Sequence, residues 1–400
     1  MFAAQAGRSG SGPLLLALFC FARTPATYNQ KEAPMSSQRV RPEILDFTPY
    51  VPGLTVEEIK ARYGLEDVIK LASNENPLGV SPLAQGAIAR AASQAYRYPQ
   101  NHSPRLTAAI GKAMGLPPGH VVAGNGSDEL IDLLFRVLAQ PGKSNVLCYE
   151  HSFSMYGLTA RLCGVDYREV PRGEDYRLPL ESLAEAVDAN TAMVFVTSPD
   201  NPTGLAARAE ELQVLAGVLP QGAVLVVDEA YMDFSWPPEE YSVLHMVPEM
   251  DNLVVLRTFS KAYGLAGLRV GYGALPLWLA DHVRRARPPF TVNLIAEEAA
   301  LAVLEDDNFY SATLEVVFNG RERLLKRLPE LGCTVWPSQA NFVMFQPPYP
   351  ADQVCEELLK RGVIVRHLKS FGLADNIRVN VGTKPETEAF LKALEDILHG

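Results

Sequence analysis

Short hydrophobic runs alternate with longer amphipathic segments through the middle of the chain, and this alternation constrains the fold most. The runs are almost continuously apolar, and several are rich in β-branched residues. Strands of a parallel sheet have this character because helices cover both of their faces. The pattern therefore predicts a doubly wound α/β unit over roughly residues 80–290. The six runs are residues 121–126, 145–150, 191–199, 222–231, 252–261 and 267–275.

The segments between and after these runs predict helices and a second unit. One helical face is formed by apolar residues at positions 130, 131, 133, 134, 137 and 138. After a long helix expected near residues 296–330, short strands and helices indicate a smaller α+β domain, which residues 40–75 join. The predicted parts are an N-terminal extension, a segment joining the small domain, a large domain and the small C-terminal domain: residues 1–38, 39–78, 79–295 and 296–400.

The composition restricts the kinds of partner. Acidic residues outnumber basic ones by 46 to 36, and the formal net charge is −10. Such a surface argues against general binding of nucleic acid or anionic membranes, so an anionic ligand would need local arginines and backbone amides. The five cysteines form no CxxC pair and the seven histidines no HxxxH or HExxH motif. We therefore expect reduced thiols, a cytoplasmic protein and no metal site.

The first 38 residues differ from the rest. Residues 13–22 form a short apolar run between Arg8 and Arg23, as in the core of a signal peptide, and this run is too short to cross a membrane as a helix. Alternatively, translation starts at Met35 and the preceding residues are an upstream extension. We favour the start at Met35, because the remaining sequence has a cytoplasmic character. In both cases these residues are expected to lie outside the folded body.

Ligands of open α/β sheets bind beyond the carboxyl ends of the strands, where this sequence has four groups of polar residues. In the first, a glycine-rich turn enters a helix whose free N–H groups could bind a phosphate at Gly126, Ser127 and Asp128. An ordinary helix N-cap would explain the same residues. In the second, Asn201 follows a strand, but turn formation alone also explains an Asn-Pro-x-Gly sequence.

The third group begins with Asp228, which directly follows a hydrophobic run. Packing explains a carboxylate poorly at this position. Such a carboxylate can pair with the nitrogen of a pyridinium ring and keep it protonated, so that the ring accepts electrons. Tyr231, three residues later, could reach a phenolic oxygen on the same ring. The alternative is that Asp228 caps a following turn.

The fourth group surrounds Lys261, which lies just past a strand among small and apolar residues. These surroundings suit Schiff-base chemistry. The hydroxyls of Thr258 and Ser260 and the guanidinium of Arg269 are placed to hold a phosphate. A lone Ser-Lys pair means little, but an arginine eight residues beyond the lysine makes the pattern much more specific.

Together, the segments SPDNPTG, VVDEAY and TFSKAYGLAGLR resemble fold-type-I pyridoxal-phosphate enzymes of the class I and II aminotransferase superfamily, over essentially residues 40–400. The resemblance implies a large, doubly wound, mostly parallel sheet domain, a smaller α+β domain and pyridoxal 5'-phosphate as cofactor. Lys261 would bind the cofactor as a Schiff base, and Asp228 would pair with its ring nitrogen. The ring oxygen would be bound by Asn201 and Tyr231, and the phosphate by Gly126, Ser127, Asp128, Thr258, Ser260 and Arg269.

Phe153 occupies the position of the aromatic residue that stacks on the cofactor ring in this superfamily. The proline-threonine that usually precedes it is His151-Ser152 here. The segments FTPYVPG (47–53), LASNENPLG (71–79) and RYP (97–99), with the paired GVIVR and IRVNVG, most resemble the histidinol-phosphate aminotransferase family within this superfamily. This likeness implies a homodimer in which Tyr98 reaches the cofactor of the other subunit. The substrate-binding residues implied by this likeness are Tyr50, Asn76, Arg366 and Arg378.

Two arginines support a phosphorylated substrate independently. Arg366 and Arg378 could meet a dianion, and could bind the two carboxylates of glutamate in turn. A surface salt bridge is the alternative explanation for Arg366.

The implied reaction is ping-pong transamination between histidinol phosphate or imidazole-acetol phosphate and 2-oxoglutarate or glutamate, with Lys261 as general base and with Asp228 and Tyr231 as further catalytic residues. One alternative is an aromatic or broad-specificity aminotransferase, and another is a decarboxylase of an amino-acid phosphate that uses the same cofactor. A third is a non-catalytic binding protein on the same fold, which the intact surroundings of Lys261 disfavour. No nucleic-acid or membrane partner is expected.

Overall fold

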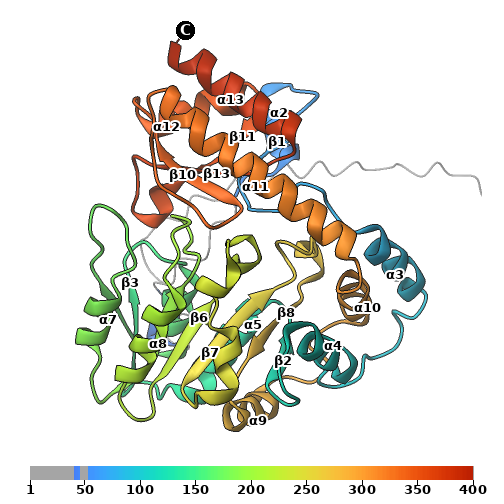
Figure 1. Cartoon of the computed structure of the whole chain (residues 1–400), viewed down its shortest axis with the longest axis vertical. Coiled ribbons are helices and arrows are strands. Elements are labelled where there is room, and N and C mark those ends of the chain that lie inside the picture. Colours follow the sequence, from blue (N-terminus) through green and yellow to red (C-terminus); the bar gives the residue numbers. More distant parts are fainter. Residues whose placement is uncertain (1–39, 46–52, 400) are drawn as a thin grey trace, which may run out of the picture. The chain divides into compact units, whose positions relative to one another are not determined.

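The computed structural model describes residues 40–45 and 53–399. The short helix α1 (Pro42–Leu45) belongs to a compact unit of its own, Met1–Asp46. Residues 53–399 lie in a second compact unit, Phe47–Gly400 (Figure 1). The predictions for residues 1–38 and for Tyr50 lie outside the described residues.

A seven-stranded sheet forms the centre of the second unit. Its strands are β2 (Val121–Gly124), β3 (Asn145–Tyr149), β4 (Asp166–Val170), β5 (Thr191–Thr197), β6 (Val224–Asp228), β7 (Leu253–Thr258) and β8 (Gly271–Ala274). Across the sheet they lie in the order β2-β8-β7-β6-β5-β3-β4. Neighbours are parallel except at β8, which runs antiparallel to both β2 and β7. The predicted mostly parallel sheet is confirmed.

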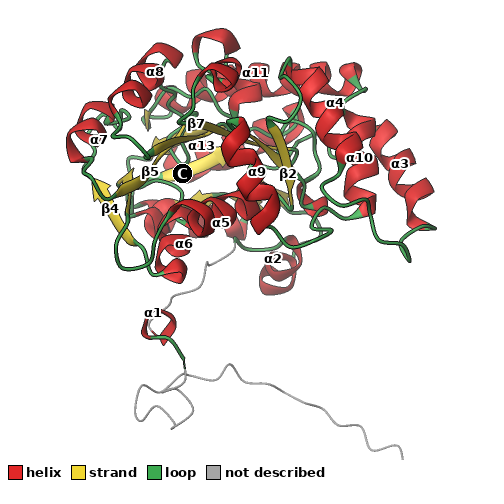
Figure 2. Ribbon diagram, turned by 90° about the horizontal axis from the view of Figure 1, so that it is seen from below, coloured by secondary structure: helices red, strands yellow, loops and turns green. Residues whose placement is uncertain are grey.

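Helices cover both faces of this sheet, as Figure 2 shows for α5 (Ser127–Leu138) and α6 (Met155–Cys163) on one face and α8 (Ala209–Val218) on the other. As a result, every residue of β5 and β6 is buried. This burial explains why the runs are apolar without alternation. The predicted apolar face of α5 packs on the sheet through Leu130, Ile131, Leu133 and Leu134.

Strand β4 was not predicted from the sequence. It lies at the edge of the sheet, and its sequence, DYREV, is mostly polar because only Val170 among its residues is buried. An edge strand pairs on one side only, so it can expose charged side chains, which also discourage pairing with other chains. Burial patterns detect central strands and miss this one.

The single long helix predicted near residues 296–330 is two helices, α10 (Leu294–Val303) and α11 (Asp307–Glu330). Asp306 separates them, because its side chain accepts a hydrogen bond from the Phe309 backbone nitrogen and caps α11. The hydroxyl of Ser81 donates to the same carboxylate at 2.5 Å. The break between the helices therefore comes from a capping aspartate. The sequence on both sides of it has the periodicity of a helix, so the pattern alone predicts one continuous helix.

The C-terminal part builds smaller sheets with a core of their own, on one side of the large sheet (Figure 1, orange and red). The antiparallel strands β9 (Thr334–Val335), β10 (Phe342–Gln346), β12 (Arg366–His367) and β13 (Ile377–Asn380) lie in the order β12-β13-β10-β9. The helices α11, α12 (Ala351–Lys360) and α13 (Lys384–His399) pack with them. This arrangement is the α+β architecture predicted for the small domain, while the exact domain boundaries stay a prediction.

The segment before the large sheet joins the smaller sheets. Strand β1 (Ile69–Lys70) pairs in parallel with β11 (Val363–Ile364). The remaining helices of this region are α2 (Val56–Tyr63), α3 (Pro82–Ala92) and α4 (Pro104–Met114), and the large unit also contains α7 (Leu180–Ala186) and α9 (Leu277–Ala286). Within residues 40–45 and 53–399, no helix combines the length and the apolar character needed to span a membrane.

Candidate functional site

A cavity of about 750 Å³ lies beyond the carboxyl ends of β5, β6 and β7. Its walls include Thr197, Asp228 and Thr258, the last residues of these strands. This size is typical of a small-molecule site. Of the predicted site residues, those that line the cavity are Ser127, Asp128, Phe153, Asn201, Asp228, Tyr231, Thr258, Ser260, Lys261, Arg269, Arg366 and Arg378.

Asn76, predicted to bind substrate, is not among the residues that line the cavity. Its side-chain nitrogen donates to the carbonyl of Ala262 at 2.8 Å and to the hydroxyl of Thr313 at 3.1 Å. Because Ala262 follows Lys261, these bonds brace the loop that carries the lysine. Asn74, from the same segment, lines the cavity in its place.

Tyr98 also lies outside this cavity. Its side chain is 83% exposed and stacks on Phe290, with 4.9 Å between the ring centroids. A residue that serves the site of another subunit would have to be exposed in this way, and that role stays a prediction.

A cradle for an anion forms where α5 begins at Ser127, directly after Gly126. A Cβ added to Gly126 would lie 2.7 Å from Nη2 of Arg269, and one added to Gly271 would lie 2.7 Å from the Ser127 backbone nitrogen. Only glycine permits this close approach. The Asp128 carboxylate lies 3.1 Å from the same guanidinium and orients it. Helix N–H groups, the helix dipole and an arginine together fit a phosphate.

Two hydroxyls complete this cradle from the end of β7. Thr258 donates to the Ser260 hydroxyl at 2.9 Å and accepts from the Ser260 backbone nitrogen at 3.1 Å. Both residues line the cavity, so their remaining hydrogen-bonding capacity is directed to the same end as Arg269.

Asp228 is a buried carboxylate whose hydrogen-bond donors within residues 40–45 and 53–399 are all neutral. The hydroxyl of Tyr156 donates to one oxygen at 2.8 Å, and the backbone nitrogen of Ala230 donates to the other at 3.1 Å. Burial raises the pKa of Asp228 to about 6, although both hydrogen bonds oppose this shift. A cationic ring placed against this carboxylate would offset the cost of its burial.

Lys261 lies on the connection between β7 and β8. Its Nζ donates to the carbonyl of Ser73 at 3.3 Å and lies 5.6 Å from the centroid of the Tyr231 ring. The amine and the tyrosine therefore share one side of the cavity. The Tyr231 hydroxyl accepts a hydrogen bond from Asn74 at 3.0 Å.

The two predicted substrate arginines face each other across paired strands, Arg366 on β12 and Arg378 on β13. Arg378 is buried and donates to the side-chain oxygen of Asn201 and, at 2.9 Å, to the carbonyl of Ala72. Arg366 donates to the hydroxyl of Ser370 at 3.2 Å. Both guanidinium groups line the cavity, so a doubly charged anion could meet both.

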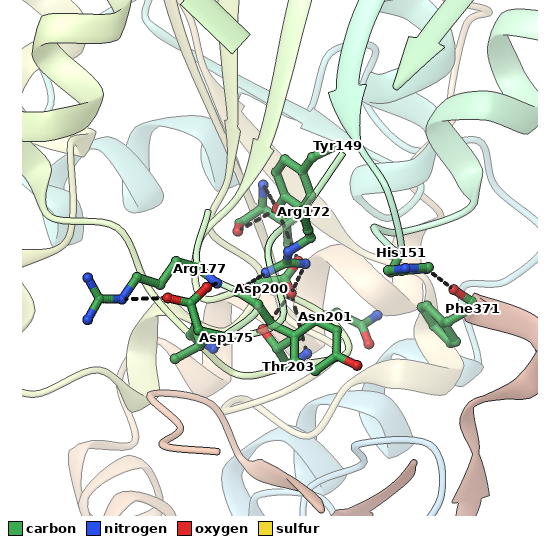
Figure 3. Close-up of polar contacts among 12 residues, drawn as sticks. Tyr149, His151, Arg172, Asp175, Arg177, Asp200, Asn201, Thr203 and Phe371 are labelled. Carbon is green, nitrogen blue, oxygen red and sulfur yellow. Dashed lines mark hydrogen bonds and ion pairs between the residues drawn. The ribbon is translucent and has the colours of Figure 1, made fainter. Parts of the chain in front are cut away.

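A buried ion pair supports the turn that carries Asn201 (Figure 3). Arg172 and Asp200 lie 2.9 Å apart, and their side chains are 1% and 0% exposed. The hydroxyls of Tyr149 and Thr203 donate to the same carboxylate at 3.0 and 2.6 Å. The carboxylate of Asp200 is thus fully hydrogen-bonded. These contacts fix Asp200, and thereby the start of the turn in which Asn201 follows it.

His151, which stands where the resemblance predicts a proline, makes a hydrogen bond in the structure. Its Nδ1 hydrogen-bonds the carbonyl of Phe371 at 2.6 Å (Figure 3). Phe371 lines the cavity from the small sheets, whereas Phe153, two residues beyond the histidine, lines it from the large sheet. The histidine therefore connects the two sides of the cavity beside the ring-stacking position.

Sequence reasoning missed Tyr156, Asn74 and Arg172. Tyr156 lies in the first turn of α6, and its backbone nitrogen donates to the carbonyl of Phe153 at 3.3 Å. Its position only three residues after Phe153 could have identified it. No local signal marks Arg172, because its partner Asp200 is 28 residues away.

Comparison with known proteins agrees with this geometry. The family model for aminotransferase class I and II matches residues 66–394. The chain is 51% identical to the histidinol-phosphate aminotransferase of Nitratidesulfovibrio vulgaris over 90% of this chain and 96% of that protein. It is 48% identical to that of Oleidesulfovibrio alaskensis, over 94% and 99%. The fold is similar to that of histidinol-phosphate aminotransferase from Sinorhizobium meliloti in complex with pyridoxal-5'-phosphate, with a TM-score of 0.82, 26% identity and coverage of 90% and 97%.

Arg172→Met should destabilise the protein, because the charge of Asp200 would stay buried without a cation. We expect the free energy of unfolding to fall by about 3–5 kcal/mol. Urea denaturation followed by circular dichroism measures this change. The double variant Arg172→Met/Asp200→Asn removes both charges and should regain much of the loss. A double variant no more stable than the single one would contradict this account of the ion pair.

Proposed function

Because the chain belongs to the class I and II aminotransferases, and within them to the histidinol-phosphate aminotransferase family, we propose that it transfers an amino group from histidinol phosphate to 2-oxoglutarate. The products are imidazole-acetol phosphate and glutamate, and the reverse reaction regenerates histidinol phosphate in histidine biosynthesis. The cofactor is pyridoxal 5'-phosphate. One observation carries the proposal: a lysine, a buried aspartate and two arginines converge on a single cavity, as Lys261, Asp228, Arg366 and Arg378.

The donors of the cavity fit this cofactor. The cradle formed by the start of α5, the two hydroxyls after β7 and Arg269 suits the phosphate. Asp228 suits the ring nitrogen, Asn201 and Tyr231 the ring oxygen, and Phe153 the face of the ring. When bound, the cofactor supplies a protonated ring that accepts electrons from the reacting carbon.

Two residues of the chain handle protons. Lys261 acts as general base: its Nζ takes the proton from the carbon that bears the amino group and delivers it to the cofactor. Asp228 holds the proton at the ring nitrogen. Its carboxylate is available for this role because its donors in the described part of the chain, Tyr156 and the Ala230 backbone, are neutral.

Two arginines bind the substrates in turn. In ping-pong transamination the phosphorylated compound and the dicarboxylic acid occupy one site successively. Arg366 and Arg378, paired across β12 and β13, bind the phosphate of the first and the carboxylates of the second. A substrate with a neutral aromatic side chain should bind less well than a phosphorylated one, because it offers no phosphate dianion to the two arginines.

Histidinol phosphate should be the best amino donor in single-turnover reactions with the cofactor-loaded protein. We expect kcat/KM for it to exceed that for phenylalanine and tyrosine by about 100-fold or more, since those substrates leave the second arginine unpaired. The absorbance change of the bound cofactor measures each rate. Lys261→Ala is the control and should show no turnover.

A different order of rates would identify an alternative function. Faster reaction with phenylalanine or tyrosine would favour an aromatic aminotransferase, and release of carbon dioxide from threonine phosphate would favour a decarboxylase. Turnover of Lys261→Ala within about tenfold of wild type would contradict the assignment of the general base.

Asp228→Asn should weaken cofactor binding in a pH-dependent way. At pH 7–8 the wild-type carboxylate is ionised and attracts the ring cation, so we expect the variant to bind about 10–100-fold less tightly. Because burial raises the pKa of Asp228 to about 6, wild type takes up a proton below that pH and the attraction is lost. The ratio of the two dissociation constants should therefore approach one near pH 5. Fluorescence titration measures both constants, and a ratio independent of pH would contradict this role.

We extend the proposal to a cytoplasmic homodimer with two composite sites. A cytoplasmic location is supported by the thiols, since Cys148, Cys163, Cys333 and Cys355 are free in the part of the chain that the structure describes. A two-fold dimer is supported by Tyr98, whose exposed side chain reaches no group in its own cavity. In the dimer its hydroxyl binds the cofactor phosphate of the partner subunit.

Complementation tests the composite sites. Tyr98→Ala and Lys261→Ala are each expected to inactivate the homodimer. Co-expression with two different tags yields heterodimers in which one site keeps both residues, so about half of the wild-type activity should return. Inactive heterodimers, or a monomer by light scattering at working concentration, would rule out the shared site.

A further inference from the structure

Ser73 and Asn74 line the cavity beside the proposed general base, Lys261. Neither residue was predicted from the sequence to belong to the site. Asn74 lines the cavity and is 1% exposed. The carbonyl of Ser73 accepts a hydrogen bond from Lys261. Asn74 has a φ of +54°, in the left-handed region, which asparagine tolerates better than most residues.

Two further buried asparagines hold the backbone of Asn74 in this conformation. The side-chain oxygen of Asn380, at the end of β13, accepts from the Asn74 backbone nitrogen at 3.2 Å. The side-chain nitrogen of Asn341, directly before β10, donates to the Asn74 carbonyl at 3.1 Å. Both main-chain groups of Asn74 are therefore paired without its own side chain.

The Asn74 side chain makes a single hydrogen bond among the described residues, and it goes to a proposed catalytic group. Its Nδ2 donates to the Tyr231 hydroxyl at 3.0 Å, while its Oδ1 is buried without a partner. A phenol hydroxyl has one hydrogen to donate and lone pairs to accept with. Because the amide occupies a lone pair, the hydrogen of Tyr231 stays free for another acceptor. The opposite amide orientation would engage that hydrogen.

We propose that Asn74 is a positioning residue that directs the Tyr231 hydroxyl hydrogen to the ring oxygen of the cofactor. This inference rests on the proposed function, which places Tyr231 at that oxygen. A donated hydrogen bond stabilises the anionic oxygen, and it therefore lowers the pH at which the bound cofactor loses its proton. Asn74 thus lowers the pKa of the bound cofactor indirectly, through the hydroxyl of Tyr231.

Two variants separate this role from a structural one. Asn74→Asp keeps the size and tolerance of positive φ but replaces the donor with a carboxylate, which accepts the tyrosine hydrogen. Asn74→Gly removes the side chain without backbone strain. In the holoprotein, the pH midpoint of the cofactor's visible absorbance should rise by about one unit or more in the Asp variant and by less in the Gly variant.

The background variant Tyr231→Phe provides the control. If Asn74 acts through the hydroxyl, Asn74→Gly should cause no further shift of the midpoint when Tyr231 is already phenylalanine. Asn74→Asp should then cause a smaller shift than with Tyr231 present, because only the charge of its carboxylate remains. Thermal unfolding of each holoprotein shows whether the fold is retained. Should the Asp variant fail to retain cofactor, the Gly variant carries the test, in both backgrounds.

The outcomes distinguish the two proposals. Midpoints that rise in the order wild type, Gly, Asp support the inference if the Gly shift vanishes and the Asp shift shrinks when Tyr231 is phenylalanine. Midpoints equal to that of wild type, or equal shifts in both backgrounds, overturn it and leave the proposed function standing. Wild-type protein that retains no cofactor with a visible absorbance band would overturn both.

Discussion

Strand β8 runs antiparallel to β7, so the connection between them begins and ends at the same edge of the sheet. A parallel β8 would need a crossover to the opposite edge, with a helix on the way. The antiparallel return keeps Lys261 and Arg269 at the carboxyl ends of the parallel strands, where β6 delivers Asp228. The lysine, the anion cradle and the buried carboxylate are neighbours because of this one reversal.

Asp228 and Glu229, two adjacent carboxylates at the end of β6, have opposite surroundings. Glu229 is paired with Arg257 at 2.7 Å and also accepts from the backbone nitrogen of Val243. Asp228 has only neutral donors among the described residues and has a raised pKa. Alternation along the strand places the two side chains on opposite faces of the sheet. The fold therefore satisfies one charge internally and directs the other to the cavity, where a cation can meet it.

The site residues that follow strands could be predicted from the sequence. The residues that hold these side chains in place could not. Asn201, Asp228 and Lys261 each follow an apolar run, so a local pattern combined with the rule for parallel sheets identifies them. Asn74 and Asn76 show the limit of that approach. They stand two residues apart, but only Asn74, whose backbone is left-handed, lines the cavity. That conformation is fixed by distant asparagines, which no local pattern reveals.

The separation of these asparagines along the sequence also determines when the cavity can form during synthesis. The bond between Asn74 and Asn380 joins residues 306 positions apart, as does the contact of Ala72 with Arg378. The large sheet, by contrast, pairs strands that all lie before residue 275. On the ribosome, this sheet can assemble while the final strand is still unmade. The nascent chain therefore presents its lysine and anion cradle early, but it gains both substrate arginines only after β12 and β13 have been made.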